Sequence, residues 1–496
     1  MRRPLRVMKF GGTSVGDAEC IERAAKIVAA ASGQGAVVVV VSAMSGVTNR
    51  LIEAAHRSQE GRQEEVAKLT DLLRIQHETA LRTLIRDETR RAQVSGAMEQ
   101  VIAETARLLQ GTALLRELTP RARDAISSAG ERLATPLVAG ALCEAGLRSV
   151  AIDATELIVT DDHHGSAAPL LEQTHERAEA RLRPLLADGI VPVATGFIGA
   201  TTDGTLTTLG RGGSDYSATI LGAALGADET IIWTDVDGVM TADPRLVPEA
   251  RTLPEISYNE AAELAYFGAK VLHPKTLRPV TQAGVPVWIR NSFAPEKPGT
   301  KITPRGRPAG GGVKALTAIR DVALITVGGP GIVGVPDVVA KTFSTTARMR
   351  ANVLLISQSS SQNDICFIIP LADAERTVAA LRQAFASDLA DQQVEHITVD
   401  PNIAIVAVVG ENMRGTPGIA GRTFSTLGRE GVNIIAIAQG SSEYNISFVV
   451  DVSAMQRAVA AVHKEFRLDE RDLREENEAA TYAEVGDGRR DDENRR

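Results

Sequence analysis

The sequence repeats itself once near its C-terminal end, and this repeat restricts the possible fold more than any other feature. Residues 327–369 align without a gap on residues 408–450, and KTFST at 341–345 matches RTFST at 422–426 within the alignment. Each copy reads as strand, Gly/Pro loop, helix, strand, turn, strand and helix, which follows the βαββαβ pattern of a ferredoxin-like unit. Two copies are too few for a solenoid, so they predict a pair of modules.

The first 300 residues show a different pattern, in which short strands alternate with helices. Five runs rich in β-branched residues and bounded by Gly, Asp or Ser predict buried strands. These runs cover residues 5–10, 36–42, 149–153, 190–196 and 229–235. Helical patterns at 19–31 and 214–226 lie between them, and this alternation predicts an α/β domain with a mostly parallel sheet. The stretch from 51 to about 120 is nearly free of Gly and Pro and predicts a helical insertion.

These patterns divide the chain into four parts. We predict an α/β domain over residues 1–300, followed by a turn-rich linker at 294–312. The first repeat module is expected at 313–395 and the second at 396–466. The last stretch, 467–496, has mixed charge and few large apolar residues, so we expect a solvated tail there.

Composition limits the partners and the compartment. The net charge is −8 and no basic stripe with interleaved aromatics occurs, so nucleic acid is not an expected partner. Cys20, Cys143 and Cys366 form neither a disulfide framework nor a zinc spacing, which fits a reducing compartment, and we predict no protein-held metal. The basic start MRRPLR is not followed by an apolar segment with a cleavage site, and the longest apolar run, 36–41, is too short for a bilayer. We therefore expect a soluble cytoplasmic protein without a membrane partner.

The first predicted strand ends in a lysine that precedes two glycines, in LRVMKFGGTSVG at 5–16. Neither the P-loop, whose lysine follows its glycines, nor the G-x-G-x-x-G fingerprint has this order. Lys9 is expected at the carboxyl edge of the sheet, where open α/β sheets bind ligands. Gly11 and Gly12 let the backbone approach an anion, and the helix that follows would offer free N–H groups to phosphate oxygens. Taken alone, a solvated lysine beside a tight turn is the simpler interpretation.

A second glycine-rich element, TLGRGGSDYSA at 208–218, makes an anion site the better interpretation. Its three glycines can form an anion-binding nest before a helix that starts at Ser214. Arg211 offers a planar fork suited to a carboxylate or a phosphate, and Asp215 can orient groups or balance a cationic lysine. The alternative is an ordinary turn with Ser214 as the helix N-cap, but a cap does not require three glycines and an arginine.

Two weaker elements follow along the chain. In WTDVDGVMTADPR at 233–245, Thr234 and Asp235 stand at a strand end and suit a nucleotide ribose or a metal-bound phosphate. The D-x-D-G sequence is also common in turns. In GAKVLHP at 268–274, Lys270 is a second lysine beside a helix-like segment, and surface charge is the alternative interpretation.

Together and in this order, before two small repeats, the four motifs resemble the aspartate kinases, members of the amino acid kinase superfamily with tandem regulatory ACT modules. The resemblance covers residues 5 to about 466. It implies an amino acid kinase fold, a mostly parallel sheet between helices, followed by two βαββαβ ACT modules. It also implies that ATP, with Mg²⁺, phosphorylates the side-chain carboxylate of L-aspartate to give 4-phospho-L-aspartate, the first step toward lysine, threonine and methionine.

The resemblance implies a role for each matching residue. Lys9 would neutralise charge on the transferring phosphoryl group, and Asp215 would hold Lys9 in place. The residues implied on the aspartate side are Ser42, Thr48, Glu131 for the amino group, Arg211 for the α-carboxylate, and Ser214. The residues implied on the ATP side are Lys9, Gly11, Gly12, Thr234, Asp235, Met240, Arg245 and Lys270. Met240 stands where tyrosine is expected beside the adenosine, which removes no charge. No general base is needed, because the acceptor carboxylate is already ionised at neutral pH.

Both repeats place a glutamine at the end of the same predicted strand, Gln358 after Ile356 and Gln439 after Ile437. Two glutamines at matched positions predict paired sites for a small polar ligand. Similar I-x-Q-x-S-S segments contribute to effector sites in threonine-sensitive aspartate kinases, so the resemblance implies that these four residues are allosteric, with threonine as the first choice of effector and lysine as the second. ACT modules usually pair across subunits, so a homo-oligomer is expected. Only the charged tail follows the repeats, which leads us to expect a free-standing kinase.

Two other interpretations remain open from the sequence. One is another amino acid kinase, such as a glutamate or N-acetylglutamate kinase, and the segment Arg211–Ser217 with the tandem repeats argues against it. The other is an amino-acid-sensing regulator whose kinase domain is inactive. The presence of Lys9, Asp215, Arg211 and Lys270 argues against inactivity.

Overall fold

The computed structural model describes residues 3–269, 272–307, 312–329, 336–358, 364–411, 413–439 and 444–470. These residues form two compact units. The first unit contains most of residues 1–307. The second contains the residues from 308 onward together with two short segments of the earlier chain, Met240–Arg251 and Phe267–Ala269. Each unit is built around its own main sheet.

The first unit has an eight-stranded sheet with the order β3-β4-β2-β1-β7-β9-β10-β8. Its strands are β1 (Leu5–Phe10), β2 (Ala36–Val41), β3 (Ser149–Ile152), β4 (Val191–Thr195), β7 (Glu229–Thr234), β8 (Glu255–Ser257), β9 (Val287–Asn291) and β10 (Thr300–Thr303), and a small separate hairpin contains β5 (Ile198–Ala200) and β6 (Leu206–Thr208). Every neighbouring pair in the large sheet is parallel except β9 with β10. The five predicted strands and the mostly parallel sheet are confirmed.

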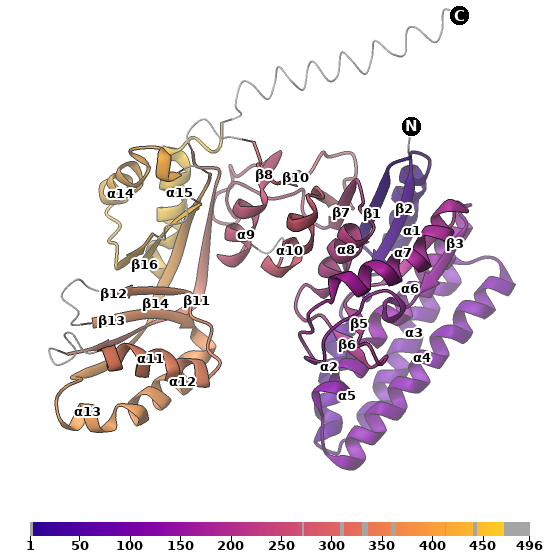
Figure 1. The fold of residues 1–496 in the computed structure, drawn as a ribbon, viewed down its shortest axis with the longest axis horizontal. Helices are drawn as coiled ribbons and strands as arrows, with labels where there is room; N and C mark the ends of the chain where they lie inside the picture. The colour runs from indigo at the N-terminus through magenta and orange to yellow at the C-terminus, as the bar shows by residue number, and fades with distance from the viewer. Residues whose placement is uncertain are drawn as a thin grey trace, which may run out of the picture. The chain divides into compact units, whose positions relative to one another are not determined.

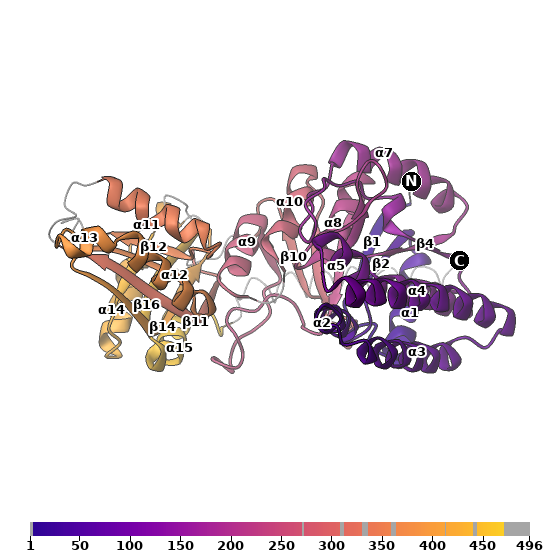
Figure 2. The same cartoon turned by 90° about the horizontal axis from the view of Figure 1, so that it is seen from below.

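Helices cover both faces of this sheet, as Figure 2 shows for α1 on one side and α7 and α8 on the other. These helices are α1 (Ala18–Ser32), α6 (Ala129–Glu144), α7 (Leu171–Ala187), α8 (Gly213–Ala224), α9 (Tyr258–Tyr266) and α10 (Pro274–Ala283). The central strand β1 is apolar on both faces for this reason: Val7 is fully buried, and Met8 and Phe10 pack into a core shared with α1 and α6.

A long helical insertion follows β2. It contains α2 (Val47–Gln59), α3 (Glu64–Leu84), α4 (Glu88–Leu115) and α5 (Pro120–Ser127). The two long helices α3 and α4 pack side by side (Figures 1 and 2). Leu73 and Met98 lie in the buried core of this unit, while Arg74 and Glu99 form an ion pair of 2.8 Å on the solvent side. This amphipathic division keeps the two helices together, and Gly96 and Gly111 lie within α4 without ending it.

The second unit has a six-stranded antiparallel sheet with the order β12-β13-β11-β14-β16-β15. Its strands are β11 (Ala315–Gly328), β12 (Leu355–Gln358), β13 (Asp364–Pro370), β14 (His396–Val409), β15 (Ala436–Ala438) and β16 (Asn445–Asp451). Its helices are α11 (Pro336–Arg348), α12 (Leu371–Ala384), α13 (Ala386–Ala390), α14 (Ile419–Arg429) and α15 (Met455–Glu465). Among the described residues of both units, no helix combines the length and apolar character needed to cross a membrane.

The two copies of the repeat are visible as matched halves of this sheet. Phe343 of α11 packs edge-on against Phe367 of β13, with ring centroids 5.6 Å apart. Phe424 of α14 packs in the same way against Phe448 of β16, at 6.2 Å. Each pair belongs to or borders its own apolar core, so each copy of the repeat buries a hydrophobic cluster of its own.

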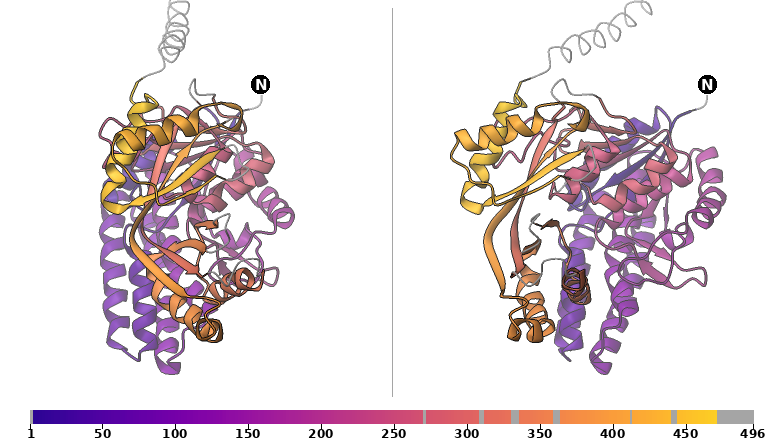
Figure 3. Two further views of the ribbon diagram at one scale, coloured as in Figure 1. Left: turned by 90° about the vertical axis from the view of Figure 1, so that its left-hand side faces the viewer. Right: turned by 60° about the vertical axis from the view of Figure 1, so that its left-hand side comes forward.

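The copies are interlocked through the two long central strands. β11 and β14 pair along their length, and Figure 3 shows both strands running through the second unit. Residues 322–328 of β11 pair with β13 of the first copy, and residues 403–409 of β14 pair with β16 of the second. Residues 315–319 of β11 pair with residues 405–409 of β14. These five residues precede the repeat in the sequence, yet they add a strand to its second copy. The boundary between modules at 395 and 396 stays a prediction.

Candidate active site

The carboxyl end of β1 places Lys9 against an acidic partner inside the first unit. Lys9 Nζ lies 2.5 Å from Asp215 Oδ1, and only 8% of Lys9 is exposed. Asp215 belongs to the first turn of α8, so the ion pair joins the end of a strand to the start of a helix. A buried ammonium needs such a partner, and the interpretation of Lys9 as a solvated lysine is therefore wrong.

The end of β2 and the start of α2 reach the same edge of the sheet. β2 pairs with β1, and the Ser42 N–H donates to the Phe10 carbonyl at 3.1 Å. The chain then turns into α2 at Gly46, which has a φ of +78° and offers no side chain to cap the helix. Thr48 lies in the first turn of this helix. An uncapped helix start leaves backbone N–H groups and a partial positive charge for a negative ligand.

The glycines after Lys9 are held close to the neighbouring strand. The Gly11 N–H donates to the Trp233 carbonyl at 3.1 Å, and a Cβ at Gly11 would lie 3.3 Å from Lys9 Nζ. The next helix, α1, begins only after Asp17, whose carboxylate accepts a hydrogen bond of 2.9 Å from the Cys20 N–H. The prediction that this helix start offers its N–H groups to phosphate is wrong, because Asp17 already caps it and brings a negative charge.

Glu131 is buried beside the Lys9 edge, in the first turn of α6. It is 4% exposed, and Ser214 Oγ donates to its Oε1 at 3.5 Å. Its second oxygen, Oε2, has no hydrogen-bond partner among the described residues. Burial raises the pKa of Glu131 to about 8, and nearby backbone N–H groups, Ser214 and the charge of Lys9 oppose that rise only in part. A buried carboxylate with an unused oxygen is suited to a cationic group of a ligand.

The Arg211 loop completes the site and depends on its glycines. Gly210 and Gly212 have φ values of +77° and +70°, and a Cβ at Gly212 would lie 2.8 Å from the His273 Cβ. Because Gly212 is the N-cap of α8 and provides no side chain, the alternative with Ser214 as the cap is wrong. Arg211 is exposed and forms no ion pair with any described residue, so its guanidinium is available to an anion.

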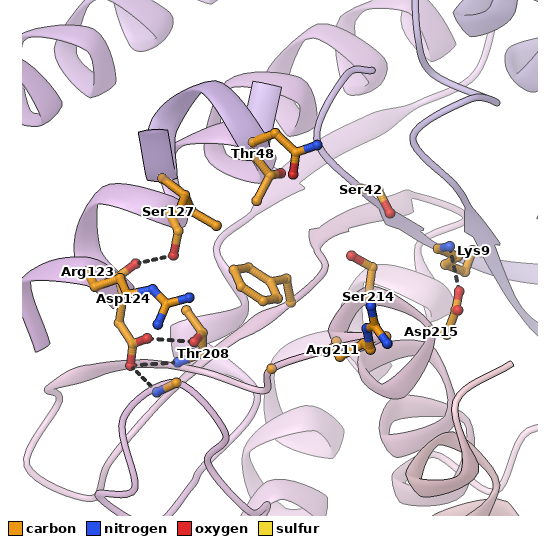
Figure 4. A pocket seen from close by; sticks show the side chains of 17 residues that line it. Lys9, Ser42, Thr48, Arg123, Asp124, Ser127, Thr208, Arg211, Ser214 and Asp215 are labelled. Carbon is orange, nitrogen blue, oxygen red and sulfur yellow. Dashed lines mark hydrogen bonds and ion pairs between the residues drawn. The ribbon is translucent and has the colours of Figure 1, made fainter. Parts of the chain in front are cut away.

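One cavity of about 600 Å³ brings these elements together (Figure 4). Of the predicted residues, it is lined by Lys9, Ser42, Thr48, Arg211, Ser214 and Asp215. Figure 4 shows the ion pair of Lys9 and Asp215 at one end, with Arg211 and Ser214 beside it and Thr48 across the cavity. A lysine, an arginine and two uncapped helix starts suit a small molecule that carries carboxylates.

Apart from Lys9, the residues predicted for the nucleotide side are not part of this lining, and neither is Glu131. Thr234 and Asp235 stand at the end of β7, the parallel neighbour of β1, and Thr234 Oγ1 donates to Asp235 Oδ1 at 3.2 Å. Met240 and Arg245 lie in the segment that belongs to the second unit. Lys270 lies outside the described residues.

The segment Met240–Arg251 is anchored in the second unit by specific bonds. The Leu316 N–H donates to the Thr241 carbonyl at 2.8 Å, and Thr241 Oγ1 lies 2.9 Å from His463 Nε2 on α15. Arg251 Nε donates to the Leu468 carbonyl at 2.9 Å. The chain that continues from the β7 motif is therefore held by elements of the second unit.

The predicted effector residues lie on the two edge strands of the second unit. Ile356 in β12 is 52% exposed, and Ile437 in β15 is 44% exposed. Gln358 ends β12 and Gln439 directly follows β15, and both are exposed. Although β12 and β15 stand at opposite ends of the strand order, they contact each other. Both matched pairs thus occupy one region.

The half of the cavity farthest from Lys9 contains residues that were not predicted as site residues. That lining includes Arg123, Asp124, Ser127, Gly165, Phe197 and Thr208. Phe197 has a φ of +70°, which is rare for a bulky side chain, and it bonds to Ser217 and Leu209 through its backbone. Nothing in the sequence marks this conformation. Asp124 offered a weak signal, an acidic residue in a short helix seven positions before Glu131.

Comparison with known proteins agrees with both halves of the chain. The model of the amino acid kinase family matches residues 4–291, and an ACT domain model matches 325–385 and 406–466. Aspartokinase 1, chloroplastic, of Arabidopsis thaliana is 33% identical over 474 residues, which cover 93% of this chain and 80% of that protein. The bifunctional aspartokinase/homoserine dehydrogenase 1, chloroplastic, of the same plant is 36% identical over 468 residues, 93% of this chain and 51% of that protein. The chain thus spans about half the length of such bifunctional relatives.

Solved structures give the same result. The chain is similar to E. coli aspartokinase III in complex with aspartate and ADP, with a TM-score of 0.77, 31% identity, and coverage of 93% of this chain and 99% of that one. It is equally similar to the same enzyme in complex with lysine and aspartate. The family models, the relatives and the site geometry converge: the chain belongs to the amino acid kinase family and, within it, to the aspartokinases that carry two ACT domains.

Proposed function

We propose that this chain transfers the γ-phosphoryl group of ATP to the side-chain carboxylate of L-aspartate, which gives 4-phospho-L-aspartate and ADP. The observation that carries the proposal is the cavity in which the pair of Lys9 and Asp215 faces the unpaired Arg211. The similar E. coli enzyme, crystallised with aspartate and ADP, supports the assignment of both substrates. The three charged residues are all present, which disfavours a regulator with an inactive kinase domain.

Aspartate would be held by Arg211, which forms no ion pair with the described residues, and by Glu131, whose Oε2 accepts no hydrogen bond from them. The planar guanidinium of Arg211 matches the α-carboxylate, and the free Oε2 of Glu131 matches the α-ammonium. With both α-substituents fixed, the side-chain carboxylate is directed toward Lys9 and the uncapped start of α8. This arrangement selects a substrate with an acidic side chain of aspartate length.

The reaction then needs positioning and charge neutralisation rather than a base. A side-chain carboxylate oxygen forms a bond to the γ-phosphorus, the bond to the bridging oxygen breaks, and its electron pair leaves with ADP. Lys9 neutralises charge on the transferring group, and Asp215 keeps the Lys9 ammonium in place at 2.5 Å.

We assign Mg²⁺ to the phosphates of ATP, where it supplies further positive charge. Mg²⁺ commonly uses one or two protein carboxylates besides phosphate oxygens. Asp235, exposed at the end of β7, is a suitable protein ligand, and Thr234 beside it offers a hydroxyl to the nucleotide. Among the described residues, no cluster of three His, Cys, Asp or Glu side chains is placed to hold an ion without substrate.

The direct test is ATP-dependent acyl phosphate formation, trapped with hydroxylamine, across aspartate, glutamate and N-acetylglutamate. We expect a hydroxamate from aspartate at least about tenfold faster than from glutamate, since one methylene in a shaped site is worth roughly 10-fold or more. A preference for glutamate or N-acetylglutamate would assign the chain to another amino acid kinase. No acyl phosphate from any of the three would support the inactive regulator.

We further propose that an amino acid bound near the edge strands β12 and β15 inhibits the reaction, with threonine as the first choice and lysine as the second. The exposed side chains of Gln358 and Gln439 can donate and accept hydrogen bonds there. The second unit also holds the segment that continues from the Thr234–Asp235 strand end, through the contact of Thr241 with His463. A shift of that unit could thus reach the nucleotide side along the chain.

The exposed isoleucines of the same edges suggest self-association. Ile356 and Ile437 are about half exposed on the contacting strands β12 and β15, a surface that a second copy of the chain would cover. We propose a homo-oligomer formed through the ACT domains. Light scattering of wild type and of an Ile356→Asp variant tests it: a wild-type monomer would contradict the proposal, and a shift of the variant toward smaller species would support it.

A further inference from the structure

The carboxylate of Asp124 is buried in the far wall of the cavity and has no role in the reaction described above. Its side chain is 2% exposed and accepts four hydrogen bonds. Thr208 donates from Oγ1 at 2.6 Å and from its N–H at 3.2 Å, the Gly165 N–H donates at 3.0 Å, and His164 Nδ1–H donates at 2.8 Å. Burying a carboxylate costs free energy unless hydrogen bonds compensate for the lost water, and these four donors provide that compensation.

All four donors belong to the stem of the Arg211 loop or to the segment packed on it. Thr208 ends β6, three residues before Arg211. The Ala167 N–H donates to the Thr208 carbonyl at 2.9 Å, and a Cβ at Gly210 would lie 2.8 Å from the Gly165 carbonyl oxygen. Asp124 therefore holds the loop twice, directly at Thr208 and through Gly165 at the residue next to Arg211 (Figure 4).

The position of Arg211 depends on this support. Its guanidinium is exposed and pairs with no described acidic side chain, so the loop backbone decides where it points. Lys9, by contrast, has its own side-chain partner in Asp215. A small displacement of the loop stem would move the guanidinium while leaving the Lys9 end of the cavity in place.

We propose that Asp124 is a positioning residue that sets the Arg211 loop for the α-carboxylate of aspartate, an inference that rests on the proposed function. The competing explanation is that Asp124 only stabilises the fold by joining α5 to the β5–β6 hairpin. The two differ in their consequences: positioning acts on aspartate and spares ATP, whereas lost stability alone changes neither Michaelis constant.

The test uses Thr208→Val, which removes the 2.6 Å hydroxyl bond and keeps the side-chain shape, with Thr208→Ser as the rescue. Thr105→Val is the matched control, because Thr105 is a buried threonine whose hydroxyl bonds only within α4. Thr208→Val should raise the KM for aspartate about tenfold, as expected for one hydrogen bond to a charged group. The KM for ATP should stay within about twofold, and Thr208→Ser should be near wild type.

Hydrogen–deuterium exchange of the backbone amides of residues 206–213 gives a second measurement that does not depend on turnover. Exchange should accelerate in Thr208→Val and in Asp124→Asn, and stay at the wild-type rate in Thr105→Val. A lower unfolding temperature with unchanged KM for aspartate and unchanged exchange would overturn the proposal, as would an equal rise of both KM values. If wild type failed to phosphorylate aspartate, the proposed function would fall, and the exchange rates would still decide whether Asp124 positions the loop.

Discussion

Replacement of Glu131 by glutamine should abolish the pH dependence of aspartate binding. The pKa of the buried Glu131 is raised to about 8, so the free enzyme carries it mostly protonated at neutral pH. Only the ionised form can pair with the α-ammonium of aspartate. For a pKa of about 8, the ionised fraction is roughly 0.01 at pH 6 and 0.5 at pH 8, so the KM for aspartate should fall about 50-fold over that range.

Initial rates at saturating ATP between pH 6 and pH 8.5 would measure this slope. In Glu131→Gln the KM for aspartate should be high and nearly flat, while the KM for ATP stays close to wild type. Glu99→Gln, which removes an exposed carboxylate of α4, is the charge-matched control and should keep the wild-type profile. A wild-type KM for aspartate that did not change between pH 6 and pH 8 would refute the role given to Glu131.

The same pKa shift predicts the stability of the ligand-free variant. Between about pH 4.5 and pH 8 the folded state keeps Glu131 protonated while the unfolded state ionises it, so wild type loses stability as pH rises through this range. Glu131→Gln does not lose stability in this way, because glutamine has no proton to release. The variant should unfold at a higher temperature than wild type at pH 8, and the gap should narrow toward pH 5. A variant less stable than wild type at pH 8 would show that the buried carboxylate is stabilising.

Three further outcomes follow from the charged groups and the matched glutamines. Lys9→Ala should lower kcat about 10²- to 10³-fold, and adding Asp215→Ala should cost little more, because the two act as one pair; near-normal turnover would exclude Lys9 from the reaction. Arg211→Lys should raise the KM for aspartate, because an ammonium cannot replace the planar guanidinium although it keeps the charge. A rise in the KM for ATP alone would show that Arg211 binds ATP and not aspartate. Gln358→Ala and Gln439→Ala should each shift the inhibition curve of threonine or lysine to roughly 2- to 13-fold higher concentration with unchanged uninhibited turnover, and a wild type that responds to neither amino acid would remove the regulatory proposal.

Much of this fold could be predicted from local pattern. β2 is a continuous apolar run, and β1 departs from one only at Arg6 and Lys9, because helices bury both faces of these strands. Such runs are visible without any tertiary information. The repeat was visible because each copy needs the same core contacts, such as Phe343 with Phe367 and Phe424 with Phe448. The interlocking of the copies was not visible in the sequence. Residues 315–319, which precede the repeat, pair with the second copy only in the folded chain.

The residues of the candidate site also divide into those visible in local motifs and those brought together only by folding. Lys9, Arg211 and Asp215 could be predicted because they stand in short motifs whose residue types indicate anion binding. Asp124 could not, because its partners Gly165 and Thr208 are 41 and 84 positions away in sequence and meet it only in the folded chain. The capping of α1 by Asp17 differs from both, because Asp17 stands just before the helix expected at 19–31 and could have been recognised as its N-cap from the sequence.

The most direct test of the central claim is the position of the phosphoryl group in the product. In the proposed site, Arg211 would hold the α-carboxylate and Glu131 the amino group, which would leave only the side-chain carboxylate of aspartate beside Lys9. Borohydride reduction of the acyl phosphate formed from ATP and aspartate would convert the phosphorylated carboxyl to an alcohol. The account predicts homoserine, the product of side-chain phosphorylation. Recovery of 3-amino-4-hydroxybutanoate, from phosphorylation of the α-carboxylate, would contradict it.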